Sequence, residues 1–105
     1  MKYIYISGKI TNNPNWKEQF KVAEMKLKAS RENNVIINPD YISQEVEKEI
    51  EHPTYKDYMQ ADLRILLICN TIYMLSNWKE SKGATLEHSI AETLGMEIIY
   101  EDSEN

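Results

Sequence analysis

Short apolar runs alternate with longer amphipathic stretches along this chain of 105 residues. The runs are rich in β-branched and aromatic side chains and end at turn residues, a pattern typical of buried strands in a parallel sheet. In the longer stretches the apolar positions recur every three or four residues, which indicates helices with one buried face. The predicted strands are 3–6, 35–37, 71–75 and 98–100, and the predicted helices are 15–32, 42–50, one opening at Pro53 and one from near Ser81 to Gly95.

Strands that alternate with helices favour βαβ units with right-handed crossovers. We therefore expect an α/β fold, a small flavodoxin-like or Rossmann-like three-layer sandwich with about four parallel strands. A chain of this length has room for one core, so residues 1–105 should form a single domain. The acidic tail, 101–105, is expected to be frayed.

The composition argues against two classes of partner, nucleic-acid polymers and membranes. The net charge is −5, from 12 basic and 17 acidic side chains, and no basic stripe offers a footprint for a nucleic-acid polymer. The longest apolar run, 65–69, is far below the roughly 20 residues that a membrane span requires. The single cysteine, Cys69, cannot form an internal disulfide and is expected to fill the core from a helical run. These features predict a cytoplasmic protein with no membrane partner.

In doubly wound sheets, ligands bind beyond the carboxyl ends of the strands. That rule selects the loops 7–10, 38–41 and 75–83, in which the expected ligand-binding residues are Ser7, Gly8, Lys9, Asn38, Trp78, Ser81 and Gly83. Ser81 and Gly83 open a helix, where free N–H groups and the positive end of the helix dipole favour a phosphate. Simpler interpretations stay open, with Ser81 as a helix cap and Trp78 as a plug at the edge of the core.

Two carboxylates fall on the apolar faces of predicted helices. Asp62 lies three residues after Met59, and Glu87 lies three residues before Ile90. Burying an unpaired carboxylate is costly, so such a group is expected to be paired or used. Each could instead lie at the rim of its face and pair with a lysine, and Tyr5 could be a site residue or plain core. Because the two histidines lie at no metal-ligand spacing, we expect no metal site, and no cofactor is expected.

Three motifs carry a resemblance to a known superfamily. They are Tyr5-x-Ser7-Gly8 after the first strand, Asp62-Leu63 before the third, and Ser81-x-Gly83-x-x-x-Glu87 at the last helix. The chain resembles the nucleoside 2-deoxyribosyltransferase superfamily, which includes the 2′-deoxynucleoside 5′-monophosphate N-glycosidases. It is most similar to short phage and bacterial domains of that group. His88, directly after the glutamate, departs from the small apolar residue usual there.

The resemblance implies roles for individual residues. It implies that Glu87 attacks the anomeric carbon of the sugar, that Tyr5 positions this glutamate, and that Asp62 contacts the leaving base. A serine at position 81 implies a 5′-phosphorylated ligand, and the superfamily implies a homodimer or higher homo-oligomer.

The leading hypothesis is cleavage or transfer of the N-glycosidic bond of a nucleoside or deoxynucleoside 5′-monophosphate by a retaining route. The rival hypothesis is a non-catalytic, phage-type module that binds and withholds a nucleotide or a nucleotide-derived signal. Release of a free base discriminates between the two. A purely structural domain is disfavoured because it leaves Asp62 and Glu87 unexplained.

Overall fold

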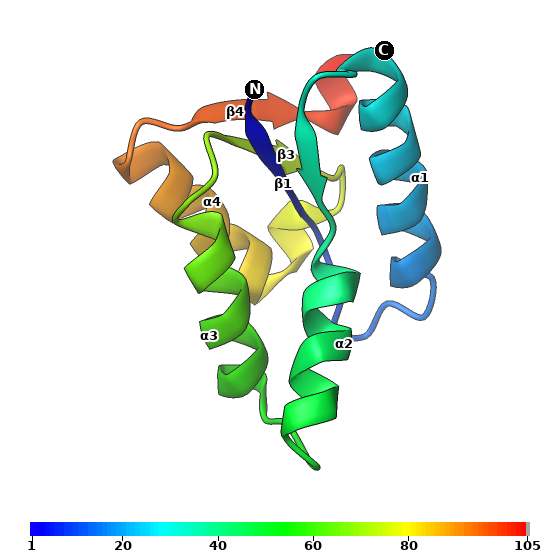
Figure 1. Cartoon of the computed structure of the whole chain (residues 1–105), viewed down its shortest axis with the longest axis vertical. Coiled ribbons are helices and arrows are strands. Elements are labelled where there is room, and N and C mark those ends of the chain that lie inside the picture. Colours follow the sequence, from blue (N-terminus) through cyan, green and yellow to red (C-terminus); the bar gives the residue numbers. More distant parts are fainter. Residues whose placement is uncertain (105) are drawn as a thin grey trace.

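The computed structural model describes residues 1–104 of the chain (Figure 1). The elements are β1 (Tyr3–Ser7), α1 (Trp16–Ser30), β2 (Val35–Ile37), α2 (Pro39–Glu49), α3 (Tyr55–Leu66), β3 (Thr71–Met74), the 3₁₀ helix η1 (Trp78–Glu80), α4 (Lys82–Thr93), β4 (Glu97–Tyr100) and the 3₁₀ helix η2 (Glu101–Glu104). The strands form one four-stranded parallel sheet in the order β2-β1-β3-β4. This architecture confirms the predicted α/β three-layer fold.

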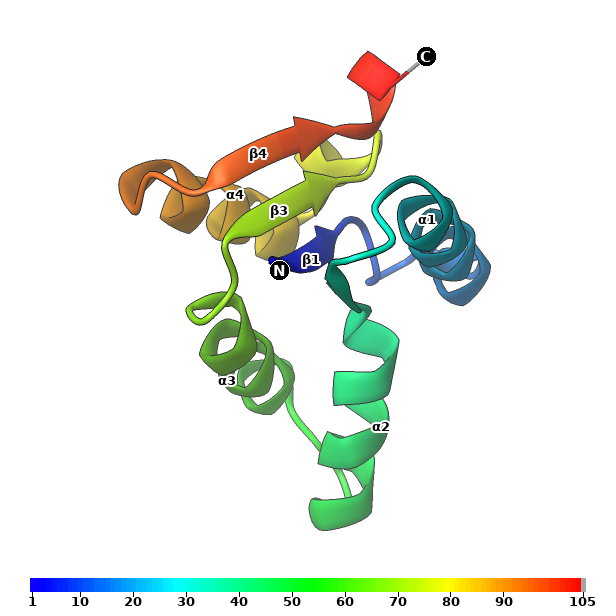
Figure 2. The ribbon, with the colours of Figure 1, turned by 45° about the horizontal axis from the view of Figure 1, so that its top comes forward.

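Alternate side chains of the central strand β1 enter opposite layers of the core. Ile4 and Ile6 pack with Phe20 on the side of α1, whereas Tyr5 packs on the side of α3 and α4. Figure 1 shows α1 on one side of the sheet and the α3–α4 pair on the other. Helix α2 packs against α3 near the carboxyl end of β1 (Figure 2). Because strand side chains alternate, Ser7 shares the face of Tyr5.

Two segments differ from the sequence prediction near their ends. Helix α2 begins at Pro39, three residues earlier than predicted, because the Asn38 side chain caps it by accepting the Asp40 N–H at 3.0 Å. In the predicted tail, η2 forms and Glu101 accepts a hydrogen bond from the Ser76 N–H at 2.8 Å, while Asn105 lies outside the described residues. Within residues 1–104, no helix is long and apolar enough to cross a membrane.

Helix α3 begins two residues later than predicted. Thr54 caps it and Asp57 completes a reciprocal capping box, so Pro53 stands before the cap instead of in the first turn. The helix ends at Leu66, and Cys69 lies in the turn that follows, not in a helical run. Cys69 is nevertheless buried in the core on the α3–α4 side.

One buried charge was not singled out from the sequence, although it lies four residues after Phe20 and three before Leu27. Glu24 of α1 is only 2% exposed, and its carboxylate binds Lys28 Nζ at 2.7 Å, Lys21 Nζ at 3.5 Å and Asn38 Nδ2 at 3.1 Å. Burial acts to raise the pKa of Glu24, but the hydrogen bonds from Lys28 and Asn38 outweigh it and hold the pKa below its ordinary value. This carboxylate therefore ties α1 to the start of α2.

Candidate functional site

A cavity of about 650 Å³ opens at the carboxyl end of β1. The loop after β1, helices α2 and α3, and the start of α4 surround it. The predicted site residues that line it are Tyr5, Ser7, Gly8, Lys9, Asp62, Ser81, Gly83 and Glu87. Its volume falls in the range of small-molecule sites, roughly 300–1,000 Å³.

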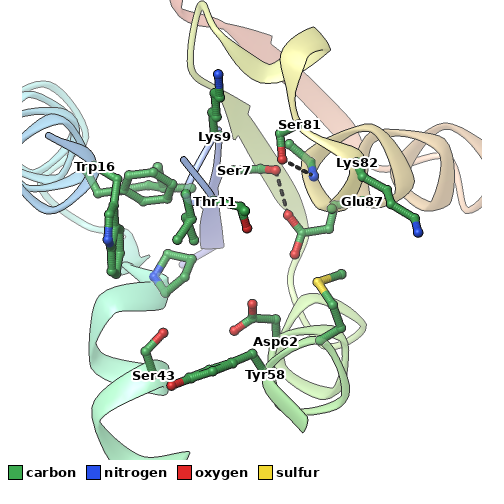
Figure 3. A pocket seen from close by; sticks show the side chains of 18 of the residues that line it. Ser7, Lys9, Thr11, Trp16, Ser43, Tyr58, Asp62, Ser81, Lys82 and Glu87 are labelled. Carbon is green, nitrogen blue, oxygen red and sulfur yellow. Dashed lines mark hydrogen bonds between the residues drawn. The ribbon is translucent and has the colours of Figure 1, made fainter. Parts of the chain in front are cut away.

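Glu87 lies at the wall of this cavity in the second turn of α4 and is 5% exposed. Tyr5 Oη donates to its Oε2 at 2.7 Å, and Ser7 Oγ donates to its Oε1 at 2.6 Å (Figure 3). The two donors are two residues apart on β1, so the alternation of the strand presents both to α4. Both oxygens of the carboxylate are thereby fixed in place.

A second carboxylate, Asp62 of α3, points toward Glu87 across the cavity (Figure 3). Asp62 is 6% exposed, and its Oδ1 has no hydrogen-bond partner among residues 1–104. Burial, followed by the nearby charge of Glu87, raises the pKa of Asp62 to about 8. At neutral pH this carboxyl group therefore holds its proton and is able to donate it.

The pKa of Glu87 is raised less than that of Asp62, because hydrogen bonds stabilise its charged form. Burial raises the pKa of Glu87 to about 7, against the hydrogen bonds from Ser7 and Tyr5, which lower it. Burial and the charge of Glu87 raise the pKa of Tyr5 well above its ordinary value, so the phenol remains a donor. Between about pH 7 and pH 8 the pair therefore favours an ionised Glu87 beside a protonated Asp62.

The start of α4 forms another wall of the cavity. Ser81 Oγ accepts the Ala84 N–H at 3.1 Å, so this residue is a helix cap whose side chain also lines the cavity. Among the described lining residues the cations are Lys9 and Lys82, and Lys9 Nζ pairs with Glu80 at 3.4 Å. A helix start beside two lysines suits an anion.

The two lining glycines are packed closely against neighbouring side chains. A Cβ atom at Gly8 would lie 2.7 Å from Leu75 Cδ1, so the ends of β1 and β3 leave no room for a side chain. A Cβ atom at Gly83 would lie 3.0 Å from Tyr55 Oη, where α3 approaches α4. The absence of a side chain is thus explained at Gly8 without a ligand, whereas at Gly83 a small shift of the Tyr55 side chain would make room.

The structure places two of the predicted ligand-binding residues away from the cavity. The Asn38 side chain is occupied by the α2 cap and by Glu24. Trp78 of η1 stacks on His88 with ring centroids 4.1 Å apart, and His88 Nε2 lies 2.7 Å from Tyr100 Oη. Neither residue is in the cavity lining, and cap and core contacts use both side chains, so ligand binding by Asn38 and Trp78 stays a prediction without support from this geometry.

Several lining residues escaped the sequence prediction. Trp16, which the periodicity assigns to the buried face of α1, also lines the cavity and contacts Phe20 edge-on. Ser43 and Glu47 of α2 and Tyr58 of α3 line it as well. A usable signal existed for Tyr58, which precedes Asp62 by one helical turn on the same face. No such signal was used for α2, whose predicted range 42–50 includes Ser43 and Glu47 but was interpreted only as a polar helix.

The buried carboxyl groups of Asp62 and Glu87 lie together in this cavity. Within the described part of the chain, no three His, Cys, Asp or Glu side chains are grouped to hold a metal ion. Two carboxyl groups in different protonation states are the pair with which proteins act at a sugar carbon. Fold and site together define a doubly wound α/β domain with paired buried carboxyl groups at its ligand-binding edge.

Comparisons with known proteins place this chain in a family. It belongs to the family described as "Domain of unknown function (DUF4406)", whose sequence profile matches residues 2–100. No curated protein sequence matches it. Among solved structures, a 2-desoxiribosyltransferase from Leishmania mexicana is similar with a TM-score of 0.66 and 16% identity, over 95% of this chain and 63% of that one. The chain therefore shares that fold and spans less than two thirds of that protein.

Proposed function

We propose that this domain binds a nucleoside or deoxynucleoside 5′-monophosphate and cleaves its N-glycosidic bond, with Glu87 as nucleophile. The observation that carries the proposal is the buried carboxylate of Glu87, held by Tyr5 and Ser7 and faced by the unpaired Asp62. The fold shared with a protein titled 2-desoxiribosyltransferase supports a nucleoside as the ligand class.

The reaction divides into two steps at the anomeric carbon. In the first, a Glu87 oxygen forms a bond to this carbon while the bond to the base nitrogen breaks, and the bonding electrons leave with the base. Asp62 gives its proton to the departing base. In the second, water or another base attacks the same carbon, the proton that it loses passes to the Asp62 carboxylate, and the bond to Glu87 breaks, so both carboxyl groups are restored and the configuration is retained. Each carboxylate oxygen has two lone pairs, so one stays free beside the hydrogen bond from Tyr5 or Ser7.

Chromatography of the products tests this proposal. Purified protein is incubated with ribonucleoside and deoxynucleoside monophosphates, and free base is quantified over time. Base release from at least one of them is the expected result. Tight binding without base release from any of them contradicts the glycosidase proposal and favours the binding module that withholds a nucleotide.

We expect nucleoside 5′-monophosphates to stabilise the protein more than the matching nucleosides. The reason is the cap at Ser81 beside Lys9 and Lys82, which offers hydrogen bonds and positive charge to a phosphate. At about 100 times the dissociation constant, a ligand adds roughly 2.7 kcal/mol to the free energy of unfolding. Thermal melts with each matched pair measure the difference, and equal shifts contradict the phosphate assignment.

We also expect a symmetric homo-oligomer, with a dimer as the simplest case. The strands β2 and β4 are the edges of the sheet, and Leu86 and Leu94 of the α4 segment are 46% and 56% exposed. Association would cover such apolar surface in a small domain. Sedimentation velocity at assay concentrations measures the mass, and a monomer at every concentration contradicts this expectation.

A further inference from the structure

The proposed chemistry leaves one end of the cavity without a role. Beyond Asp62 the cavity continues between α2 and α3, where it is lined by Ser43, Glu47 and Tyr58, called here the distal residues. Figure 3 shows Ser43 and Tyr58 on the opposite side of the cavity from Ser81. Tyr58 and Asp62 are one helical turn apart, about 6 Å along the axis. A base whose glycosidic nitrogen lies near Asp62 therefore reaches the distal residues with its far edge.

Two of the distal residues, Glu47 and Tyr58, present only hydrogen-bond acceptors to a ligand. Tyr58 Oη donates to Glu47 Oε2 at 2.8 Å, and this bond uses the only proton of the phenol. The Glu47 carboxylate accepts and does not donate. The lining cations within residues 1–104 lie elsewhere, since Lys82 is in the first turn of α4 and Lys9 pairs with Glu80. A ligand edge that meets Glu47 and Tyr58 must therefore bring N–H donors, whereas the Ser43 hydroxyl can donate or accept.

A buried polar atom independently points to a ligand at the entrance to this region. Oδ1 of Asp62 is buried and lacks a hydrogen-bond partner among the described residues, and the side chain points into the cavity. Such an atom is costly unless a ligand completes its hydrogen bonding. The base is thus expected to run from Asp62 toward Glu47.

We propose that Glu47 accepts a hydrogen bond from an amino group on the far edge of the base, so that adenine or cytosine is the preferred base. This inference rests on the proposed function. Adenine and cytosine present an amino group opposite the sugar, whereas guanine, hypoxanthine, uracil and thymine present an oxygen there. An oxygen would face the carboxylate with lone pairs on both sides and leave it unpaired. Tyr58 is a positioning residue, because its phenol fixes the carboxylate.

The size of the preference follows from the exposure of Glu47. Sites that bury such a hydrogen bond completely reject the wrong analogue by roughly 10⁴-fold or more. Glu47 is an exposed residue, so water competes for its carboxylate. We therefore expect about a tenfold preference for the base that carries the amino group.

Two pairs of monophosphates isolate the amino group. AMP and IMP differ at this edge by an amino group against an oxygen, and so do CMP and UMP. Dissociation constants for the four are measured by calorimetry on the whole chain, as wild type, Glu47→Gln, Tyr58→Phe and Glu45→Gln. Glu45 lies on α2, binds Lys48 at 3.1 Å and is outside the cavity lining, which makes it a matched control.

Wild type and Glu45→Gln are expected to prefer AMP over IMP and CMP over UMP by about tenfold. In Glu47→Gln the preference should fall below about twofold, since an amide offers both a donor and an acceptor. Tyr58→Phe should weaken the preference while keeping the advantage of monophosphates over nucleosides. Equal affinities within both pairs in the wild type, with base release intact, overturn this inference alone. The 2′-deoxy forms of the four are measured in the same way, and failure of every ligand to bind in both forms overturns the proposed function and this inference together.

Discussion

Replacing Glu87 by glutamine is expected to lower the rate of base release by about 10³-fold or more, with ligand binding retained. An amide oxygen is a poor nucleophile, so no glycosyl intermediate forms. Tyr5 and Ser7 keep a partner of the same shape, and the variant avoids a buried charge, so the fold should persist. Single-turnover release of base, followed by chromatography, measures the effect.

Two further variants make this result specific. Glu92→Gln changes a carboxylate that is 62% exposed on the same helix and should leave the rate within about twofold of the wild type. Asp62→Asn should lose less than Glu87→Gln, because it removes assistance to the leaving base and keeps the nucleophile. If Glu87→Gln still releases base at a rate near that of the wild type, Glu87 is not the nucleophile.

The rate of base release should have a narrow optimum between about pH 7 and pH 8. The reaction needs an ionised Glu87, whose pKa is raised to about 7, and a protonated Asp62, whose pKa is raised to about 8. Below the optimum Glu87 gains a proton, and above it Asp62 loses one, so the rate falls about tenfold per pH unit on each side. Initial rates measured from pH 5 to pH 10 report the profile. In Asp62→Asn the fall above pH 8 should disappear, and its persistence would assign that limb to another group.

The same two groups give the stability of the fold a pH dependence of defined sign. The pKa of Glu87 is raised from 4.5 to about 7 and that of Asp62 from 3.8 to about 8, both mainly by burial. The folded state therefore keeps protons that the unfolded state has released. Stability from this source is present below the ordinary pKa values and is lost as the pH rises through about 7 and 8. Urea unfolding at pH 5 and pH 9 should show that Asp62→Asn loses less stability than the wild type over this interval.

Helical spacing was sufficient to predict that both carboxyl groups face inward. Asp62 and Glu87 occupy positions three or four residues from apolar neighbours, and the structure buries both. The same spacing holds for Glu24, four residues after Phe20 and three before Leu27, but spacing does not distinguish a site carboxylate from one paired with Asn38 and two lysines of its own helix. Periodicity describes one helix at a time, so it does not predict a hydrogen-bond partner that another element supplies.

The two tryptophans illustrate a second limit. Trp78 follows β3 at the predicted ligand-binding edge, yet its ring turns to His88, whereas Trp16 belongs to the buried stripe of α1 and also lines the cavity. Which way a side chain leaves a loop depends on the elements packed around it. The positions of the loops after the strands identified the edge of the sheet at which the cavity opens. The orientation of these two rings required the tertiary structure.

The close approach at Gly8 affects how related chains should be sought. A Cβ atom at this position would collide with Leu75. The glycine of the Ser-Gly pair is therefore required by the close approach of the ends of β1 and β3. A search pattern built on Ser7-Gly8 would retrieve chains that share this sheet, whatever reaction they carry out. A pattern requiring Tyr5 and Ser7 together with Glu87 would select instead for the hydroxyl pair that holds the carboxylate. Chains retrieved only by the first pattern would share the fold without these site residues, and chains retrieved by both would share the fold and the site.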